Sequence, residues 1–406
     1  MKKILNVRDL ELKGKKVLIR VDFNVPIDAN GKITDDTRIR ASLPTIQYVL
    51  KSGGACILMS HLGRPKAKEK ALSLTPCAKR LEELLGKKVI MAPDCIGAHV
   101  QEMASHLLPQ EVLLLENVRF YPEEEKPEKN PSFAKELASL ADYYVNDAFG
   151  SAHRAHSSTT QVASYFPQKA AMGFLMEKEL NFLGDAIENP KRPFYAIIGG
   201  AKVSTKLNVL KNLSKKVDLL FLGGGMAYTF LKAKGIEVGD SLVELEMQDT
   251  AKELLSTYKH IILPEDIVAA TQFANDSAFK VFDVTVQGIP NGYQGMDIGP
   301  KTITEWSSLI NKAKTILWNG PVGVFEFPQF AKGTNALAHK MADLKNCITI
   351  VGGGDSVSAI QQAGVSEHIS HLSTGGGASL EFLEFGTLPG VEVLSTIAIK
   401  VMGKTT

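Results

Sequence analysis

The chain has 406 residues, of which 44% are hydrophobic and 22% are charged, and its net charge at neutral pH is +2. This length is too great for one compact core and favours two domains of about 200 residues each. The near-neutral charge argues against a general nucleic-acid-binding protein, which needs a broad basic face.

Cysteine usage and the N-terminal sequence indicate the compartment. Four cysteines without CxxC spacing do not make a disulfide framework. The N-terminus lacks the apolar stretch of a signal peptide, and no run approaches the roughly 18 apolar residues that span a bilayer. We therefore expect a soluble, cytoplasmic protein without a membrane partner.

Short apolar runs, each followed by a polar or glycine-rich turn and an amphipathic stretch, recur along the chain. They cover residues 17–21, 55–60, 111–117, 142–147, 194–200, 217–225, 260–266, 315–320, 348–354 and 369–377. Continuously apolar strands that alternate with helices are typical of parallel sheets covered on both faces. The pattern predicts a doubly wound α/β architecture with four strands in the first half and six in the second. We expect that it misses some strands of the first half.

Residues 173–194, between the two halves, carry apolar side chains at helical spacing until Asn189-Pro190 ends the pattern. A single helix that joins two domains can act as a hinge, because domains with small interfaces move relative to one another. An ordinary packed helix would fit the same pattern.

Arginine and glycine are segregated along the chain. All nine arginines lie at or before residue 192, whereas 24 of the 34 glycines follow residue 190. Arginine forms bidentate hydrogen bonds with carboxylates and phosphates, and clustered glycine lets backbone N–H groups approach an anion. The segregation predicts two half-molecules that bind two different anions.

Polar residues of the first half follow the strand ends, where ligands of open parallel sheets bind. Cations lie there or at the start of a helix, namely Arg38 or Arg40, Arg64, Arg119 and Arg154. Together they would receive a small polyanion, although each alone could be a solvated surface residue. His61, His153 and His156 lack metal-binding spacing, so we expect neutral imidazoles that donate hydrogen bonds to phosphate rather than a zinc site.

The second half has neither a P-loop motif nor GxGxxG after its first strand. Instead, GGAKVSTK (199–206) follows a strand and opens a predicted helix. Lys202 and Lys206 are four residues apart, so we expect both on one helical face near the N-terminus, where they would share a phosphate. Two solvated lysines would fit the same spacing.

Glycine runs at 223–225, 352–354 and 375–377 also follow strands, and their N–H groups could cradle phosphate. Asp355, directly after one run, is a candidate ligand for Mg²⁺. The turn 318–326 could form one side of a purine-binding pocket and let Glu326 accept hydrogen bonds from ribose hydroxyls.

The motifs together resemble those of phosphoglycerate kinases, in order and along essentially the whole chain. The segments that carry the resemblance are RVDFNVP, SHLGRP, ENVRF, NDAFGSAHRAHSS, GGAKVSTK, GGGMAYTF, WNGPVGVFE, GGGDS and STGGGASLE. The resemblance implies reversible phosphoryl transfer from 1,3-bisphosphoglycerate to MgADP, which gives 3-phosphoglycerate and MgATP in glycolysis. It also implies two doubly wound, Rossmann-like domains joined by a hinge helix.

The implied domains are a glycerate-binding domain (1–172), a hinge helix (173–189) and a nucleotide-binding domain (190–390), with the tail 391–406 returning to the first domain. Carried over by motif, the glycerate site is Asp22, Asn24, Arg38, His61, Arg64, Arg119 and Arg154. The nucleotide site is Lys202, Lys206, Gly224, Asn319, Glu326, Gly353, Gly354, Asp355 and Ser356. Position 356 is serine where many relatives have threonine, so a hydroxyl is kept.

Transfer from an acyl phosphate needs no general base, because the attacking carboxylate of the reverse reaction is already ionised. We assign charge neutralisation in the transition state to Arg38 and Lys202, with Mg²⁺ at Asp355, after domain closure in a monomer. Two other classes remain open. A NAD-dependent dehydrogenase would share the fold but lacks its GxGxxG here, and a non-catalytic sugar-phosphate or nucleotide-binding module would not need Lys202 or Asp355.

Overall fold

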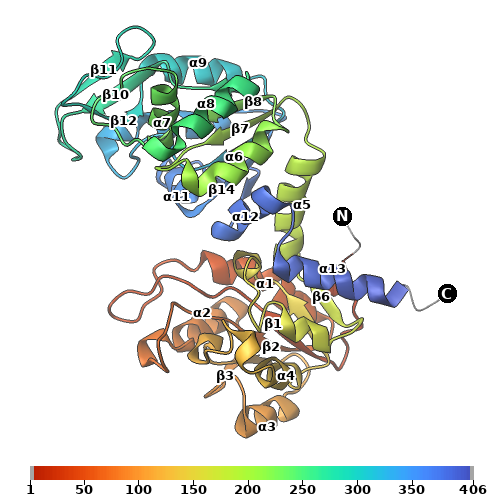
Figure 1. The fold of residues 1–406 in the computed structure, drawn as a ribbon. Helices are drawn as coiled ribbons and strands as arrows, with labels where there is room; N and C mark the ends of the chain where they lie inside the picture. The colour runs from red at the N-terminus through yellow and green to blue at the C-terminus, as the bar shows by residue number, and fades with distance from the viewer. Residues whose placement is uncertain (1–3, 403–406) are drawn as a thin grey trace. The chain divides into compact units, whose positions relative to one another are not determined.

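The computed structural model of the chain describes residues 4–402, with side chains described for residues 4–395. It divides into two compact units (Figure 1). Unit 1 comprises Met1–Asn181 and Thr387–Thr406, and unit 2 comprises Phe182–Gly386.

Unit 1 contains a six-stranded sheet in the order β3-β4-β2-β1-β5-β6, in which every pair of neighbours is parallel. Its strands are β1 (Lys16–Arg20), β2 (Ala55–Met59), β3 (Val89–Met91), β4 (Val112–Leu114), β5 (Tyr143–Asn146) and β6 (Ala170–Met172). The four predicted strands are present. The sequence pattern missed β3 and β6, which are the two edge strands of this sheet. Ile90 and Met91 of β3 are only half-buried, and β6 is rich in small alanine side chains.

Helices cover both faces of this sheet. They are α1 (Thr37–Lys51), α2 (Thr75–Leu85), α3 (Ala98–His106), α4 (Ser132–Ala138) and α13 (Pro389–Met402). Side chains alternate along a strand, so Val17 and Ile19 pack into one cluster with α1 and α2, while Leu18 packs into another with α3, α4 and α13. Helix α13 is held by Gly390, whose N–H donates to Ala152 O at 2.8 Å.

Helix α5 (Phe174–Glu188) runs across the sequence boundary between the units. Its N-terminus is anchored in unit 1. Asp147 Oδ1 accepts hydrogen bonds from the N–H groups of Leu175 at 2.9 Å and Met176 at 3.2 Å, and Phe174 N donates to Thr45 Oγ1 at 2.9 Å. Burial raises the pKa of the Asp147 carboxyl to about 6.

Unit 2 contains a second parallel six-stranded sheet, in the order β15-β14-β13-β7-β8-β9. Its strands are β7 (Phe194–Ile198), β8 (Leu219–Leu222), β9 (Ile261–Ile262), β13 (Thr315–Asn319), β14 (Ile348–Gly352) and β15 (His371–Leu372). All six lie in predicted runs. The predicted doubly wound α/β class is confirmed.

The helices of unit 2 are α6 (Leu207–Ser214), α7 (Gly225–Ala233), α8 (Gln248–Thr257), α9 (Pro300–Ile310), α10 (Lys332–Ala342), α11 (Gly354–Gln362) and α12 (Gly377–Phe385). Trp306 of α9, Leu337 of α10 and Ile360 of α11 are buried in one cluster with Ile197 and Trp318 of the sheet. Three helices therefore share one face of this sheet.

A small antiparallel sheet in unit 2 was not predicted. It has the order β11-β10-β12 and consists of β10 (Asp266–Ala270), β11 (Phe279–Asp283) and β12 (Gln294–Ile298). The strand pattern of this sheet is weak in the sequence, because β11 is largely exposed and β12 combines a glycine with the buried Asp297.

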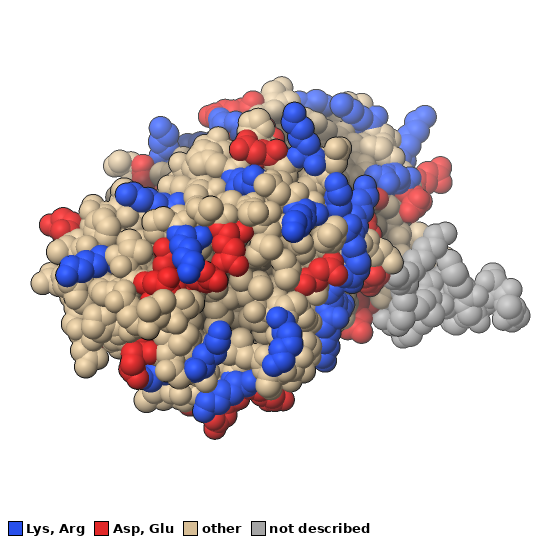
Figure 2. Space-filling model, turned by 90° about the horizontal axis from the view of Figure 1, so that it is seen from above, with Lys and Arg blue, Asp and Glu red and all other residues tan. Residues whose placement is uncertain are grey.

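The surface carries charges of both signs. On the face seen in Figure 2, lysine and arginine side chains are interspersed with aspartate and glutamate. Within residues 4–402, no helix is long and apolar enough to cross a membrane.

Candidate active site

The predicted glycerate residues follow four neighbouring strands of unit 1. Strands β4, β2, β1 and β5 are adjacent and parallel, so the segments after them meet at one edge of the sheet. Charges there are close enough to influence one another. The pKa of His61 is held well below its ordinary value by burial first, and then by the charges of Arg20, Arg119 and Arg38.

Arg38, Asp22 and Asn24 form one group. Arg38 lies in the first turn of α1, and its Nη1 donates to both Asp22 carboxylate oxygens at 3.2 Å and to Asn24 O at 3.1 Å. Gly63 N donates to Asn24 Oδ1 at 2.8 Å. The segment after β1 is thereby tied to the segment after β2, and a third of the Arg38 side chain stays exposed, at 33%.

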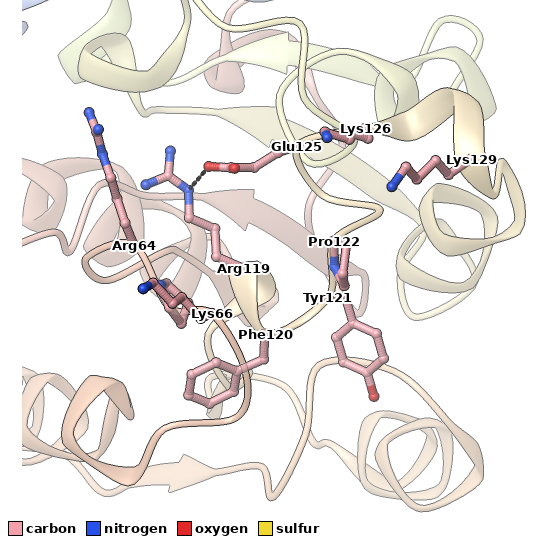
Figure 3. Close-up of a pocket in the computed structure, with 10 residues that line it drawn as sticks. Arg64, Lys66, Arg119, Phe120, Tyr121, Pro122, Glu125, Lys126 and Lys129 are labelled. Carbon is pink, nitrogen blue, oxygen red and sulfur yellow. Dashed lines mark ion pairs between the residues drawn. The ribbon is translucent and has the colours of Figure 1, made fainter.

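Arg119 and Arg64 line a cavity of about 230 Å³ together with three lysines and one carboxylate: Lys66, Lys126, Lys129 and Glu125 (Figure 3). Arg119 Nη1 donates to Gly63 O at 2.8 Å, and its Nε forms an ion pair with Glu125 Oε1 at 3.0 Å. Burial lowers the pKa of Arg119. The charges of Arg20 and Arg154 lower this pKa further, whereas the charge of Glu125 raises it. Cations exceed anions in this cavity, as an anion site requires.

The three histidines predicted to lie near the glycerate site, His61, His153 and His156, are neutral at neutral pH. Burial and then the charge of Arg119 lower the pKa of His156 to about 3, and burial followed by Arg154 lowers that of His153. A neutral imidazole has one donor and one acceptor nitrogen, so each ring can donate a single hydrogen bond.

A buried polar network behind this site was missed. Arg20, the last residue of β1, is only 1% exposed, and its Nε donates to Ser158 Oγ at 2.7 Å. Ser158 in turn donates to Glu124 Oε1 at 2.6 Å, and Glu124 is fully buried. A charged residue inside an apolar run was the available signal, because a buried charge needs a partner.

Glycines let three loops of unit 2 come into contact at the ends of β7, β8 and β13. Gly200 N donates to Pro321 O at 3.1 Å, and Gly224 N donates to Val322 O at 2.9 Å. A Cβ on Gly199 would lie 2.0 Å from Pro321 O, and one on Gly224 would lie 2.7 Å from Gly200 N. These positions therefore exclude any larger residue.

The prediction that Lys202 and Lys206 share a helical face is wrong. Helix α6 begins only at Leu207, after a 3₁₀ turn at Ser204–Lys206, and Lys202 lies in the loop before it. Lys206 Nζ turns inward and donates to Gly199 O and Asn319 Oδ1, both at 2.7 Å, and burial lowers its pKa to about 8. Lys202 is exposed. The two ammonium groups therefore have different environments.

The end of β13 is joined to the glycine run after β14. Asn319 Nδ2 donates to Gly352 O at 2.9 Å, and the Ser356 hydroxyl accepts a hydrogen bond from Gly320 N. Helix α11 begins at Gly354, directly after Gly353 with φ of +92°. Asp355 is exposed in its first turn, and Glu326 is exposed after the 318–325 segment.

Helices α7, α11 and α12 all begin in the glycine runs, with Gly224, Gly353 and Gly376 as their N-cap residues. Helix N-termini preceded by glycine are a common way to bind phosphate. One unit with such N-termini and another with clustered arginines fit the class of a kinase that binds two anionic substrates.

Comparison with known proteins specifies the family. The model of the phosphoglycerate kinase family matches residues 7–385. The chain is 55% identical to the phosphoglycerate kinase of Moorella thermoacetica over 396 residues, with 96% of this chain and 99% of the relative covered. It is 54% identical to the cytosolic phosphoglycerate kinase of Triticum aestivum over 392 residues, covering 95% and 96%. The structure of phosphoglycerate kinase from Coxiella burnetii is similar, with a TM-score of 0.88, 40% identity and coverage of 98% and 100%.

The chain belongs to the phosphoglycerate kinase family. Its members are kinases of glycolysis that transfer a phosphoryl group to and from a carboxyl group. The predicted family and reaction class are confirmed.

Proposed function

We propose that this chain transfers the acyl phosphoryl group of 1,3-bisphosphoglycerate to MgADP, and the reverse, by in-line transfer. The observation that carries the proposal is the cluster of Arg38, Arg119 and His61 at one sheet edge. Arg20 lies close enough to lower the pKa values of His61 and Arg119, and Arg154 lies close enough to lower that of Arg119. Such a cluster fits a small substrate that has a phosphate at one end and a carboxylate or acyl phosphate at the other.

In this proposal unit 1 holds the glycerate substrate. Arg64, Arg119 and Arg154 neutralise its phosphate, while His61 donates a hydrogen bond to it. Asp22 and Asn24 orient it, and Asp22 also holds the Arg38 guanidinium through the ion pair at 3.2 Å. Arg38 is aimed in this way at the reacting end of the substrate.

Unit 2 holds the nucleotide. The N–H groups of Gly224, Gly353 and Gly354 bind its phosphates at the starts of α7 and α11. Glu326 accepts hydrogen bonds from the ribose. The remaining nucleotide-site residues are Lys202, Lys206, Asn319 and Ser356, of which Lys206 and Ser356 also support the loops through the contacts described above.

Magnesium is the expected partner of the nucleotide. Within residues 4–402, no group of three or more histidine, cysteine, aspartate or glutamate residues could hold a metal ion. The single exposed carboxylate of Asp355 fits Mg²⁺, because this ion keeps several waters and takes most other ligands from substrate phosphates. When bound, the ion would neutralise phosphate charge.

The residues present suit a reaction without a general base. The attacking carboxylate is already ionised at neutral pH, and the imidazoles of His61 and His156 are neutral and lie close to several arginines. Catalysis then consists of positioning and charge stabilisation, which we assign to Arg38 and Lys202.

We propose a glycerate-binding domain of residues 1–172 with the tail 391–406, a hinge at 173–189 and a nucleotide-binding domain of 190–390. The anchoring of the α5 N-terminus by Asp147 and Thr45 supports a hinge that responds to unit 1. Residues 1–3 and 403–406, and the side chains of 396–402, lie outside the described residues.

Hinge closure should shorten the molecule when both substrates bind. Small-angle X-ray scattering of the free protein and of its complex with 3-phosphoglycerate and MgADP, a pair that cannot react, will measure this. We expect a smaller radius of gyration only when both ligands are present, because each domain holds one of them. An unchanged radius would contradict the hinge at 173–189.

We further propose that the protein is a cytoplasmic monomer. The cytosolic relative from Triticum aestivum supports the compartment. Each of the two units has its own sheet and core, which is consistent with a monomer that needs no partner chain.

The central test is the formation of ADP from MgATP. We expect ADP to appear only when 3-phosphoglycerate is also present. Tight binding of both ligands without ADP formation would instead indicate a binding module, and reduction of NAD by a hydroxy acid would indicate a dehydrogenase.

A further inference from the structure

A buried guanidinium lies against a predicted substrate-binding histidine. Arg20 Nη2 is 3.1 Å from His61 Nδ1, and the two residues are 1% and 6% exposed. A guanidinium is always protonated and can only donate hydrogen bonds. Nδ1 of His61 must therefore accept this hydrogen bond, and the ring proton of the neutral imidazole must lie on Nε2.

Arg20 is fixed by contacts on its other nitrogens. Its Nε donates to Ser158 Oγ at 2.7 Å, and its Nη1 donates to Val21 O. Ser158 is itself held by Glu124 and by the Tyr144 hydroxyl, which donates to Ser158 O at 3.0 Å. These contacts hold the guanidinium beside His61, and it cannot become the acceptor of a hydrogen bond from the ring.

We infer that Arg20 is a positioning residue that holds His61 as the Nε2–H tautomer, so that His61 offers the glycerate substrate a hydrogen-bond donor and not a lone pair. The inference rests on the proposed function, which places a substrate oxygen beside His61. Among the described residues, none accepts a hydrogen bond from His61 Nε2. This nitrogen is therefore free to contact a ligand.

The tautomer matters because every oxygen of a phosphate or carboxylate is an acceptor at neutral pH. The opposite tautomer would direct a lone pair at an anionic oxygen and an N–H group at the Arg20 guanidinium. If Arg20 were purely structural and served only to neutralise the buried Glu124, its replacement would leave the His61 tautomer unchanged. The response of the tautomer to substitution of Arg20 therefore separates the two roles.

The first test uses the unaltered full-length protein, so it does not depend on a variant that folds. Histidine rings labelled with ¹⁵N are observed by NMR through their two-bond proton–nitrogen couplings, and His61 is assigned by the signals lost in His61→Gln. We expect His61 to be the neutral Nε2–H tautomer without any ligand. The Nδ1–H tautomer, or an imidazolium at neutral pH, would overturn the inference.

The second test removes the donor. In Arg20→Met we expect His61 to populate both tautomers and the KM for 3-phosphoglycerate to rise about tenfold or more, as for the loss of one charge-assisted hydrogen bond. The KM for MgATP should not change, and Arg20→Lys, which keeps a donor, should restore most of the affinity. In Arg20→Met combined with Glu124→Gln, which leaves no unpaired buried carboxylate, the tautomer should still be mixed. If His61 stays in one tautomer in both variants, Arg20 does not position it.

Leu81→Ala is the matched control for lost stability, because Leu81 is fully buried in α2 of the same unit and lies in a different core cluster from Tyr144. It should leave the His61 tautomer unchanged. A titration with 3-phosphoglycerate then tests the proposed function separately. Unmoved His61 signals would refute the glycerate site, whatever tautomer the free protein shows.

Discussion

Replacing Lys202 with alanine should lower kcat by about a thousandfold and leave the Kd for 3-phosphoglycerate near its native value. Lys202 is exposed in the loop after β7, so its ammonium group is available to the phosphoryl group in transit. A single cation placed on a transferring phosphoryl group contributes on the order of 10³-fold or more. Steady-state kinetics and calorimetric titration with 3-phosphoglycerate measure the two quantities.

The control for this substitution is Lys211→Ala, which removes an exposed lysine from α6. It should change kcat by less than about twofold, because a solvated surface charge contributes little at a distance. If Lys202→Ala keeps its turnover and instead binds 3-phosphoglycerate weakly, the assignment of Lys202 to the nucleotide side is wrong.

Replacing Gly320 with alanine should lower the free energy of unfolding by about 3 kcal/mol, from overpacking and left-handed strain together, and abolish nucleotide binding. A Cβ at this position would lie 2.2 Å from Gly199 O and 2.6 Å from Lys206 Nζ, and φ is +95°. The backbone oxygen cannot move without displacing the loop after β7. Chemical denaturation and titration with MgADP are the measurements.

Gly354→Ala is the matched control for stability. A Cβ there would meet no atom within 4 Å, and the residue is the first of α11 without a left-handed φ. Its free energy of unfolding should stay within about 1 kcal/mol of the native value. Equal destabilisation by both substitutions would show that close contact between the loops after β7 and β13 is not what requires glycine at position 320.

The parallel sheets could be predicted because their central strands are continuous apolar runs of four or five residues. Strands β3 and β6 could not, since both are short edge strands, of which β3 is only partly buried and β6 consists mostly of alanine. The antiparallel sheet was missed for a different reason. Its strand β12 contains Asp297, whose buried carboxylate accepts a hydrogen bond from Gly333 N at 2.7 Å, so a polar residue occupies a core position.

Within the site, the sequence identified side chains but not their orientation. Position after a strand end was sufficient to group Arg38, Arg119 and His61. It was not sufficient for Lys206, whose inward turn depends on Asn319, 113 residues later in the chain. The role of Arg20 was not recognised for the same reason, because its partners Ser158 and Glu124 are distant in sequence.

The return of the chain to unit 1 through α13 affects the order in which the protein can fold during synthesis. The described part of that helix contributes Leu394 to the core and Gly390 to hydrogen bonds with Ala152 and Asn146. Unit 2, by contrast, ends at Gly386. Although chains usually fold from the N-terminus as they leave the ribosome, unit 2 has all of its residues before unit 1 does. The unit that begins first is completed last, and its core lacks α13 until the whole of unit 2 has been synthesised.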